Sequence, residues 1–382
     1  MNSLVKRKIV LGVFLTISSF WAVAGDVDTL VKKKPFWKEL RNPLEFKWKR
    51  LTVALFPVCS YDPASGVELG IMPVFSVSPK DTSSSKYYRA SSLVNHLTYS
   101  TNEWINIRND GQYFTPSGFC YKSFTQYLNA PDYFYGIGND TLNPNPSSFN
   151  YEYFKAVFEV TKTIKQKHFL GLKVDFMTTS ISKETGAFLN SEISGAKGGE
   201  MIGIGPVYRL DSRNNVNYPS RGTYAEFSAL LFQKGGEIEY SFNMYNIDFR
   251  KYLNPVSDLI IAYQANLNVT TGDVPFYRMP AIGGKYNLRG ISNKFMYIDK
   301  NCWFTQVELR KMLFWRLGAV AFTGVGNNFR TWDADIITNV KPIYGFGCRF
   351  QMVPRDMLNL RFDYSFGPNG DKGFYATVRE IF

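Results

Sequence analysis

Few residues in this sequence are suited to catalysis or to metal binding. The histidines and cysteines are His96, His168, Cys59, Cys120, Cys302 and Cys348. The cysteines lie far apart, and none has the Cys-x-x-Cys spacing of a zinc site. A covalent nucleophile needs a base held beside it, and neither histidine lies in a motif that would supply one. We therefore expect no catalytic residue, no metal and no cofactor, and we do not expect an enzyme.

Charged residues at short spacing offer a different chemistry, which is ion pairing inside the protein. Asp211 and Arg213 are two positions apart, and Glu308 shares one face of a predicted strand with Phe304, Gln306 and Arg310. Residues two apart on a strand point to the same side. An enclosed guanidinium needs a carboxylate partner, because an unpaired buried charge is costly. The Asp211–Arg213 pair could also be an ordinary surface turn, so the elements around these residues decide their role.

Those elements are predicted to be β-strands, because side-chain character alternates with a period of two. Residues 358–365 read Leu-Asn-Leu-Arg-Phe-Asp-Tyr-Ser, and residues 170–176 and 245–250 alternate in the same way. A soluble sandwich would turn the apolar face inward. A membrane barrel turns that face to lipid and keeps the polar face in its lumen.

About sixteen such strands follow one another from Leu51 onward. The predicted spans are 51–61, 66–79, 91–102, 103–115, 118–129, 149–163, 167–181, 198–212, 222–234, 240–253, 257–271, 297–313, 315–328, 342–353, 358–366 and 373–382. Long polar connections at 80–90, 139–148, 182–197 and 272–296 are expected outside the cell and short turns inside. The predicted fold is all-β, an antiparallel transmembrane β-barrel of about sixteen strands over residues 51–382.

The first residues are typical of an export signal. Lys6, Arg7 and Lys8 precede an apolar run to about Ala22, and Ala22-Val23-Ala24 fits the cleavage rule for signal peptides. This run is shorter than the about 20 residues of a membrane-spanning helix. We expect residues 1–24 to be a signal peptide. Residues 25–50 are expected to form a short periplasmic tail, either flexible or lying on the membrane surface.

The composition favours the same location. Aromatic residues make up 16% of the chain, and the formal net charge is +12. Many aromatics and alternating strands after an export signal are typical of outer-membrane barrels. The positive charge fits anionic lipid head groups and a charged lumen better than nucleic acid. We expect a bacterial outer-membrane protein whose partners are lipids, with no nucleic acid.

The connection 272–296 carries a motif of its own. It contains Gly283-Gly284 and then Leu288-Arg289-Gly290-Ile291, between the eleventh and twelfth predicted strands. This resembles loop six of the Omp85 superfamily, the barrels related to BamA and TamA, also described as the bacterial surface antigen family. In that family the loop folds back into the lumen, and its tip carries an apolar-Arg-Gly-aromatic motif. Leu288, Arg289 and Gly290 match, and Ile291 replaces the aromatic residue.

A second match lies in the turn before residue 222. Asp211, Arg213, Pro219 and Gly222 resemble the family's Asp-x-Arg and Pro-x-x-Gly pattern between two strands.

Two predicted strands resemble the family's arginine-binding strands. Gln306-Val307-Glu308-Leu309-Arg310 resembles the motif of strand twelve, whose glutamate contacts the loop arginine. Phe322-Thr323-Gly324-Val325-Gly326 resembles the Phe-x-Asp-x-Gly motif of strand thirteen, with Gly324 in place of the aspartate. The resemblance implies that Arg289 binds Glu308, which can accept a bidentate hydrogen bond. Because Gly324 supplies no second carboxylate, we expect Glu308→Gln to loosen loop six nearly as much as Arg289→Ala.

The ends of the barrel are expected to meet in a weak seam, as in that family, where the seam is thought to open laterally. Pro57 cannot donate to a ladder, although a harmless bulge is the alternative explanation for it. Gly373 begins the predicted last strand, and Glu380 interrupts its apolar face of Phe374, Ala376 and Val378, so both should weaken closure too. Phe382 resembles the terminal aromatic residue of the outer-membrane assembly signal.

The resemblance implies a role in inserting or translocating outer-membrane proteins. Its partners would be client barrel proteins, accessory subunits or a second copy of the chain. The family normally carries POTRA domains before the barrel, and residues 25–50 are too few for one, so we expect a short form without them. The alternative is a passive pore or structural barrel plugged by loop six.

Overall fold

The computed structural model describes residues 45–48, 50–62, 66–77, 90–140, 146–186, 189–353 and 357–382. The predicted signal peptide and most of the predicted tail lie outside these residues. The end of that tail is described, and there Glu45–Trp48 forms a short strand, β1, which pairs with the start of the first long strand.

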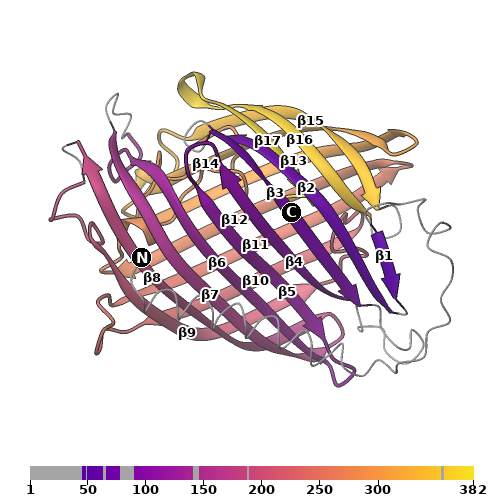
Figure 1. Cartoon of the computed structure of the whole chain (residues 1–382), viewed down its shortest axis with the longest axis horizontal. Helices are drawn as coiled ribbons and strands as arrows, with labels where there is room; N and C mark the ends of the chain where they lie inside the picture. Colours follow the sequence, from indigo (N-terminus) through magenta and orange to yellow (C-terminus); the bar gives the residue numbers. More distant parts are fainter. Residues whose placement is uncertain are drawn as a thin grey trace.

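Sixteen longer strands form one antiparallel sheet that curls into a nearly closed barrel (Figure 1). They are β2 (Leu51–Asp62), β3 (Gly66–Val77), β4 (Ser91–Ser100), β5 (Ile105–Phe114), β6 (Phe119–Phe134), β7 (Ser147–Lys165), β8 (His168–Thr185), β9 (Gly198–Asp211), β10 (Gly222–Phe232), β11 (Phe242–Val256), β12 (Leu259–Gly272), β13 (Asn301–Phe314), β14 (Leu317–Phe329), β15 (Lys341–Val353), β16 (Leu358–Phe366) and β17 (Lys372–Val378). Each pairs with the next along the chain, and β17 lies beside β2. The predicted all-β barrel of about sixteen strands is confirmed.

Two predictions about strands and connections need correction. The last strand ends at Val378 rather than at residue 382. The connection after β3 is long, yet strand parity places it at the same end of the barrel as the two-residue turns after β7 and β13. Long connections are therefore not confined to one end. Among the described residues, no helix is long and apolar enough to cross a membrane.

The polar face of the strands points into the barrel. On β16, Asn359, Arg361, Asp363 and Ser365 are all buried. On β8, Leu170 and Leu172 are exposed whereas Asp175 is buried. This is the reverse of a soluble sandwich, and it follows from the period-two alternation once the sheet closes with its polar face inward.

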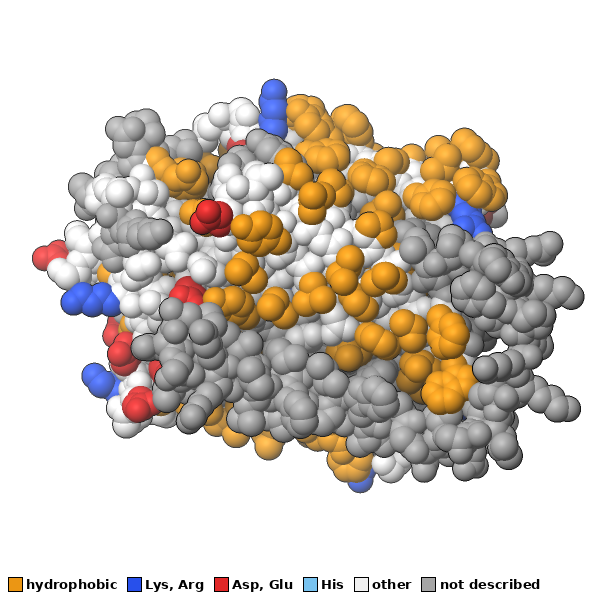
Figure 2. All heavy atoms as spheres, in the orientation of Figure 1, with side chains coloured by type: hydrophobic (Ala, Val, Ile, Leu, Met, Phe, Trp, Pro, Cys, Tyr) orange, Lys and Arg blue, Asp and Glu red, His pale blue; other side chains and the backbone are white. Residues whose placement is uncertain are grey.

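The outer wall is apolar. Exposed large side chains such as Leu69, Ile71 and Tyr99 lie on β3 and β4. Figure 2 shows apolar side chains in a broad band across the wall, with most of the visible charged side chains toward one end. A band of this kind is what a lipid bilayer requires of a barrel wall.

The largest hydrophobic core lies in the lumen. Phe134, Phe149 and Tyr151 of β6 and β7 pack there against Phe276 and Phe295, which belong to the connection between β12 and β13. The interior is therefore packed around a loop that enters it.

Candidate functional site

The connection 273–300 between β12 and β13, called loop six below, folds into the lumen. Ile282, Leu288 and Ile291 are fully buried, and they pack with Phe304 of β13 and Phe322 of β14. Three of these side chains come from the loop and two from the wall, so the loop's apolar residues fix its depth in the barrel.

Arg289 lies at the centre of this packing and is fully buried. One terminal nitrogen of its guanidinium donates to Glu308 of β13, and the other donates to Asp363 of β16 at 2.6 Å. The guanidinium carbon lies 3.6 Å from the centre of the Phe322 ring. Two carboxylates and an aromatic face together solvate a cation that has no access to water.

Asp363 was missed by the sequence analysis. It supplies the second carboxylate that Gly324 does not, and it does so from β16 rather than from β14. The space beside Gly324 is occupied, since a Cβ there would lie 2.9 Å from the Leu288 side chain. Asp363 could have been suspected only as a charged residue on the polar face of a strand. Its sequence position gives no link to Arg289.

Two glycines allow the loop backbone to approach the wall. A Cβ on Gly290 would meet Ile343 of β15, and a Cβ on Gly373 would meet the backbone oxygen of Arg289. That oxygen accepts hydrogen bonds from Ser365 Oγ at 2.8 Å and from the Tyr375 hydroxyl at 2.9 Å. Gly373 thus makes room for loop six against β17, which is a different role from the weakened closure we expected of it.

The ion pairs around Arg289 extend into a larger buried cluster, called the arginine cluster below. Its members are Arg289, Arg310, Arg349, Arg361, Glu308, Asp363 and Glu380. Arg310 binds Glu308 at 2.7 Å, and Arg349 binds Asp363 at 2.6 Å and Glu380 at 2.9 Å. Four guanidiniums thus face three carboxylates, and these ion pairs join loop six to β13, β15, β16 and the residues after β17.

The chain turns into the lumen after β17. Arg379 adopts the left-handed conformation with φ 71°, and its backbone N–H donates to the backbone oxygen of Asn359 at 3.0 Å. Glu380 then reaches the arginine cluster. Phe382 is buried against Tyr252 of β11, and its backbone oxygen accepts a hydrogen bond from Arg310 at 2.8 Å.

This inward turn corrects two expectations. Glu380 does not interrupt an apolar outer face, and Phe382 does not close an extended last strand. The positive φ at Arg379 breaks the period-two alternation, so both side chains point inside.

Loop six has further contacts around the lumen that the sequence did not reveal. Arg278 binds Asp175 of β8 at 2.7 Å. The Tyr286 hydroxyl accepts a hydrogen bond from Arg108 of β5 at 2.9 Å. Together with Arg289, these contacts tie the loop to β5, to β8 and to the β13–β16 side of the wall.

The Asp-x-Arg turn between β9 and β10 also faces inward. Arg213 makes a bidentate pair with Asp211, with both N···O distances 2.9 Å, and stacks 4.5 Å above the Tyr224 ring. Gly222 ends the turn with φ 112°, and the neighbouring Pro219 is buried. The pair is therefore enclosed, not an ordinary surface turn, but it makes no contact with Arg289 among the described ion pairs.

The same turn brings Tyr218 toward the arginine cluster. Burial raises the pKa of Tyr218 to about 12, and the negative charge of Glu380 acts in the same direction. Val216 and Asn217 of this turn line a cavity together with Lys285 of loop six and Glu380, and strand parity places the turn, after β9, at the end of the barrel opposite to loop six, after β12.

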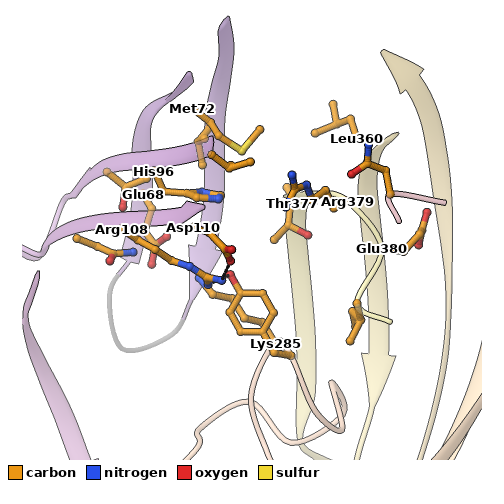
Figure 3. Close-up of a pocket in the computed structure, with 18 of the residues that line it drawn as sticks. Glu68, Met72, His96, Arg108, Asp110, Lys285, Leu360, Thr377, Arg379 and Glu380 are labelled. Atoms are coloured by element: carbon orange, nitrogen blue, oxygen red, sulfur yellow. Dashed lines mark hydrogen bonds and ion pairs between the residues drawn. The ribbon is translucent and has the colours of Figure 1, made fainter. Parts of the chain in front are cut away.

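A cavity of about 310 Å³ lies beside the seam between β2 and β17. Figure 3 shows its two walls. Glu68, Met72, His96, Arg108 and Asp110 lie on one wall, Leu360, Thr377, Arg379 and Glu380 on the other, and Lys285 of loop six between them. Pro57 also lines it, and β2 keeps its register with β3 through Pro57 without a bulge.

No protein-family model and no curated protein matches the chain. Solved structures do match its fold. The chain is similar to BamA from Haemophilus ducreyi lacking POTRA domains 1–3, with 14% identity, a TM-score of 0.56, and 87% of this chain and 70% of that chain covered.

Two further matches are to CdiB. CdiB from Escherichia coli gives 9% identity and a TM-score of 0.58, covering 87% of this chain and 63% of that chain. CdiB from Acinetobacter baumannii gives 12% identity and a TM-score of 0.52, covering 86% and 59%. The chain thus spans about three fifths of each CdiB. It therefore has the β-barrel fold of BamA and CdiB, which is the fold that its resemblance to the Omp85 superfamily predicts.

Proposed function

We propose that this protein is a bacterial outer-membrane barrel that assists the insertion or translocation of other outer-membrane proteins through the seam between β2 and β17. The observation that carries the proposal is the shape of β17. It has seven residues whereas β2 has twelve, and the chain leaves the wall at Arg379. One edge of β2 is therefore longer than the strand beside it.

The membrane makes this mismatch important. In lipid each unsatisfied backbone group costs several kcal/mol, so the part of the β2 edge that β17 does not reach favours pairing with another strand, and in this structure the short strand β1 (Glu45–Trp48) pairs with Leu51–Ala54 there. Strand addition to an open sheet edge is a common mode of peptide recognition. Partners in this role would be client barrel proteins, with accessory subunits or a second copy of the chain alongside the membrane lipids.

The arginine cluster supports the proposal from inside the barrel. It holds the end of the chain, through Glu380 and the Phe382 backbone oxygen, away from the wall. It also holds loop six against β16 and β17. The inward end is thus stabilised by several buried hydrogen bonds and does not depend on one weak contact.

The second candidate is a passive pore or structural barrel. It is favoured by the filling of the lumen, because loop six and the turn 212–221 enter from opposite ends. In this case the seam would have no function.

Disulfides across the seam can distinguish an insertion or translocation barrel from a passive barrel. Native Cys59 lies exposed on β2 and can remain as one partner, with the other three cysteines replaced. Phe374→Cys or Ala376→Cys on β17 supplies the second thiol, and the variant that oxidises closes the seam. Leu69→Cys is the matched control, because Leu69 faces Cys59 across the permanent β2–β3 ladder.

The measurement is the rate at which a urea-unfolded eight-stranded barrel inserts into liposomes that contain this protein. We expect this protein to accelerate insertion when its cysteines are reduced. The acceleration should be lost when a disulfide joins β2 to β17, and it should be kept when a disulfide joins β2 to β3. If the reduced barrel gives no acceleration, the passive barrel is the better description. If the reduced protein, the β2–β17 disulfide form and the β2–β3 disulfide form accelerate insertion equally, insertion does not use the seam.

A further inference from the structure

The seam edge of β2 is covered by β1 over its first four residues. Leu51–Ala54 pair with β3 on one edge, and the same residues pair with β1 on the other. β17 lies beside β2 as well. In Figure 1, β1 lies just beyond the end of the C-terminal strands, next to the start of β2.

β17 is too short to cover the whole of β2. Seven residues cannot face twelve, and the residues after Val378 are held inside by Arg349 and Arg310. Without β1, the edge of Leu51–Ala54 would present unpaired backbone groups near the rim of the membrane. Such groups are costly in lipid and attract other strands.

β1 is a small cover for this edge. It offers four pairs, from Glu45↔Ala54 to Trp48↔Leu51, whereas β2 and β3 share twelve. Phe46 is 58% exposed, and its partner Val53 lies on the outer face, since the next residue, Ala54, is buried toward the lumen. A four-residue strand at the edge of a sheet has few contacts to lose when it leaves.

We propose that β1 is a displaceable cover of the seam edge at Leu51–Ala54, and that it occupies this docking site until a β-strand of an unfolded outer-membrane barrel replaces it. The inference deepens the proposed function and rests on it. Backbone pairing supplies the binding without regard to sequence, and the outer face of Leu51 and Val53 selects apolar residues at alternate positions. Strands of membrane barrels have this pattern.

Crosslinking tests the exchange. In a background without native cysteines, Phe46→Cys and Val53→Cys join β1 to β2, because these residues are direct partners. Val53→Cys with Phe75→Cys is the matched control, which joins β2 to β3 at the same β2 position. A photoreactive residue placed at Leu51 forms a crosslink to whichever strand lies beside it. The probe strand is supplied by the urea-unfolded eight-stranded barrel.

We expect the probe to crosslink at Leu51 in the reduced protein. The yield should fall by about tenfold or more when β1 is joined to β2, because a tethered strand outcompetes a free one. The crosslinking yield should return to its original level on reduction and stay unchanged in the β2–β3 control. Replacing residues 45–48 by a Gly-Ser segment should raise the crosslinking yield. Equal yields with β1 free and joined, or no crosslink in the reduced protein, would overturn the proposal.

Insertion rates from the same samples keep the two proposals apart. Crosslinking that depends on β1 without accelerated insertion supports the docking site and contradicts the proposed function. Accelerated insertion that is indifferent to the β1 disulfide supports the function and contradicts the docking site.

Discussion

At the scale of single residues, the arginine cluster determines how loop six is held. Its four guanidiniums share three carboxylates, and in the described structure each guanidinium keeps one nitrogen without a hydrogen-bond partner. The cluster therefore has too little negative charge, and losing a carboxylate should be worse than losing an arginine. This reverses the order expected from the sequence, where Glu308 was expected to matter through Arg289 alone.

The first prediction concerns Glu308→Gln and Arg289→Ala. Glu308→Gln leaves four guanidiniums with two carboxylates and should cost about 3–5 kcal/mol of barrel stability. Arg289→Ala leaves three of each, so the barrel should melt closer to wild type while loop six becomes sensitive to protease. The midpoint of heat-induced unfolding, read from gel migration, measures the first effect, and limited proteolysis measures the second.

Glu237→Gln, on the exposed connection between β10 and β11, is the control for removing a carboxylate. If Arg289→Ala melts well below Glu308→Gln, the charge balance is not what stabilises the cluster.

The second prediction concerns Gly324→Asp, which restores the aspartate of the family motif. We expect it to destabilise the barrel by about 1–3 kcal/mol through overpacking, because Leu288 occupies the space beside Gly324 and Asp363 already binds Arg289. The unfolding midpoint measures this cost. Adding Leu288→Ala should recover part of the loss. A Gly324→Asp barrel more stable than wild type would show that the cluster accepts a carboxylate from β14.

At the scale of elements, the end of β17 is the main departure from regular barrel structure. The left-handed residue Arg379 turns the chain inward, and the last side chain then packs under β11 and β12. A residue with positive φ costs of order 1–3 kcal/mol unless its surroundings hold it there. Here the surroundings are the ion pair of Glu380 and the packing of Phe382.

The third prediction separates packing from signalling at Phe382. Phe382→Ala should lower barrel stability by about 3–5 kcal/mol, as for other buried aromatics, even when the protein refolds in detergent without assembly factors. Phe374→Ala on the preceding strand, β17, is the control, since Phe374 is 44% exposed on the outer wall. If Phe382→Ala refolds normally in detergent but fails to assemble in cells, Phe382 acts as a signal and its packing is secondary.

At the scale of the whole molecule, the sheet forms a nearly closed barrel that is filled by its own connections. Loop six is fixed to distant parts of the wall by Arg278, Tyr286 and Arg289. The turn that contains Tyr218 enters from the other end. The apolar wall is tested by membrane fractionation and gel migration, and the filled lumen is tested by single-channel conductance.

The fourth prediction concerns the wall. An apolar belt around a closed antiparallel sheet should make the protein extractable only with detergent. Its migration on gels should also change on heating, because the folded barrel resists unfolding by detergent at room temperature. Membrane fractionation and paired heated and unheated samples measure both. Recovery in a soluble periplasmic fraction would contradict an outer-membrane location.

The fifth prediction concerns the lumen. Wild-type protein in a planar bilayer should conduct little, because loop six is held across the interior. Arg278→Ala combined with Arg289→Ala removes the two arginine side chains that pair loop six with Asp175 of β8, Glu308 of β13 and Asp363 of β16, and it should increase the single-channel conductance. Lys234→Ala, on an exposed connection, is the control. A double variant that conducts as wild type would show that the loop's apolar packing and its remaining hydrogen bonds keep it in place.

The sequence by itself determined the strands, the polar lumen and the position of loop six. Period-two alternation is a local property, because adjacent side chains of any strand point to opposite faces. It therefore located β16 and its polar face without knowledge of the neighbours. The same alternation led to an error at Glu380, because it assumes an extended backbone and the positive φ at Arg379 was not visible in the residue types.

Beyond the pair of Arg289 and Glu308, only the tertiary structure decided which charges meet. Asp363 is 74 positions from Arg289 along the chain, and nothing in the spacing relates them. Their contact depends on how far loop six descends and on which strands the curled sheet brings around it. The pairing of β1 with the edge of β2 could not be predicted from the sequence for the same reason. β1 needs the gap left when β17 ends early, and that gap exists only once the buried ion pairs hold the end of the chain inside the barrel.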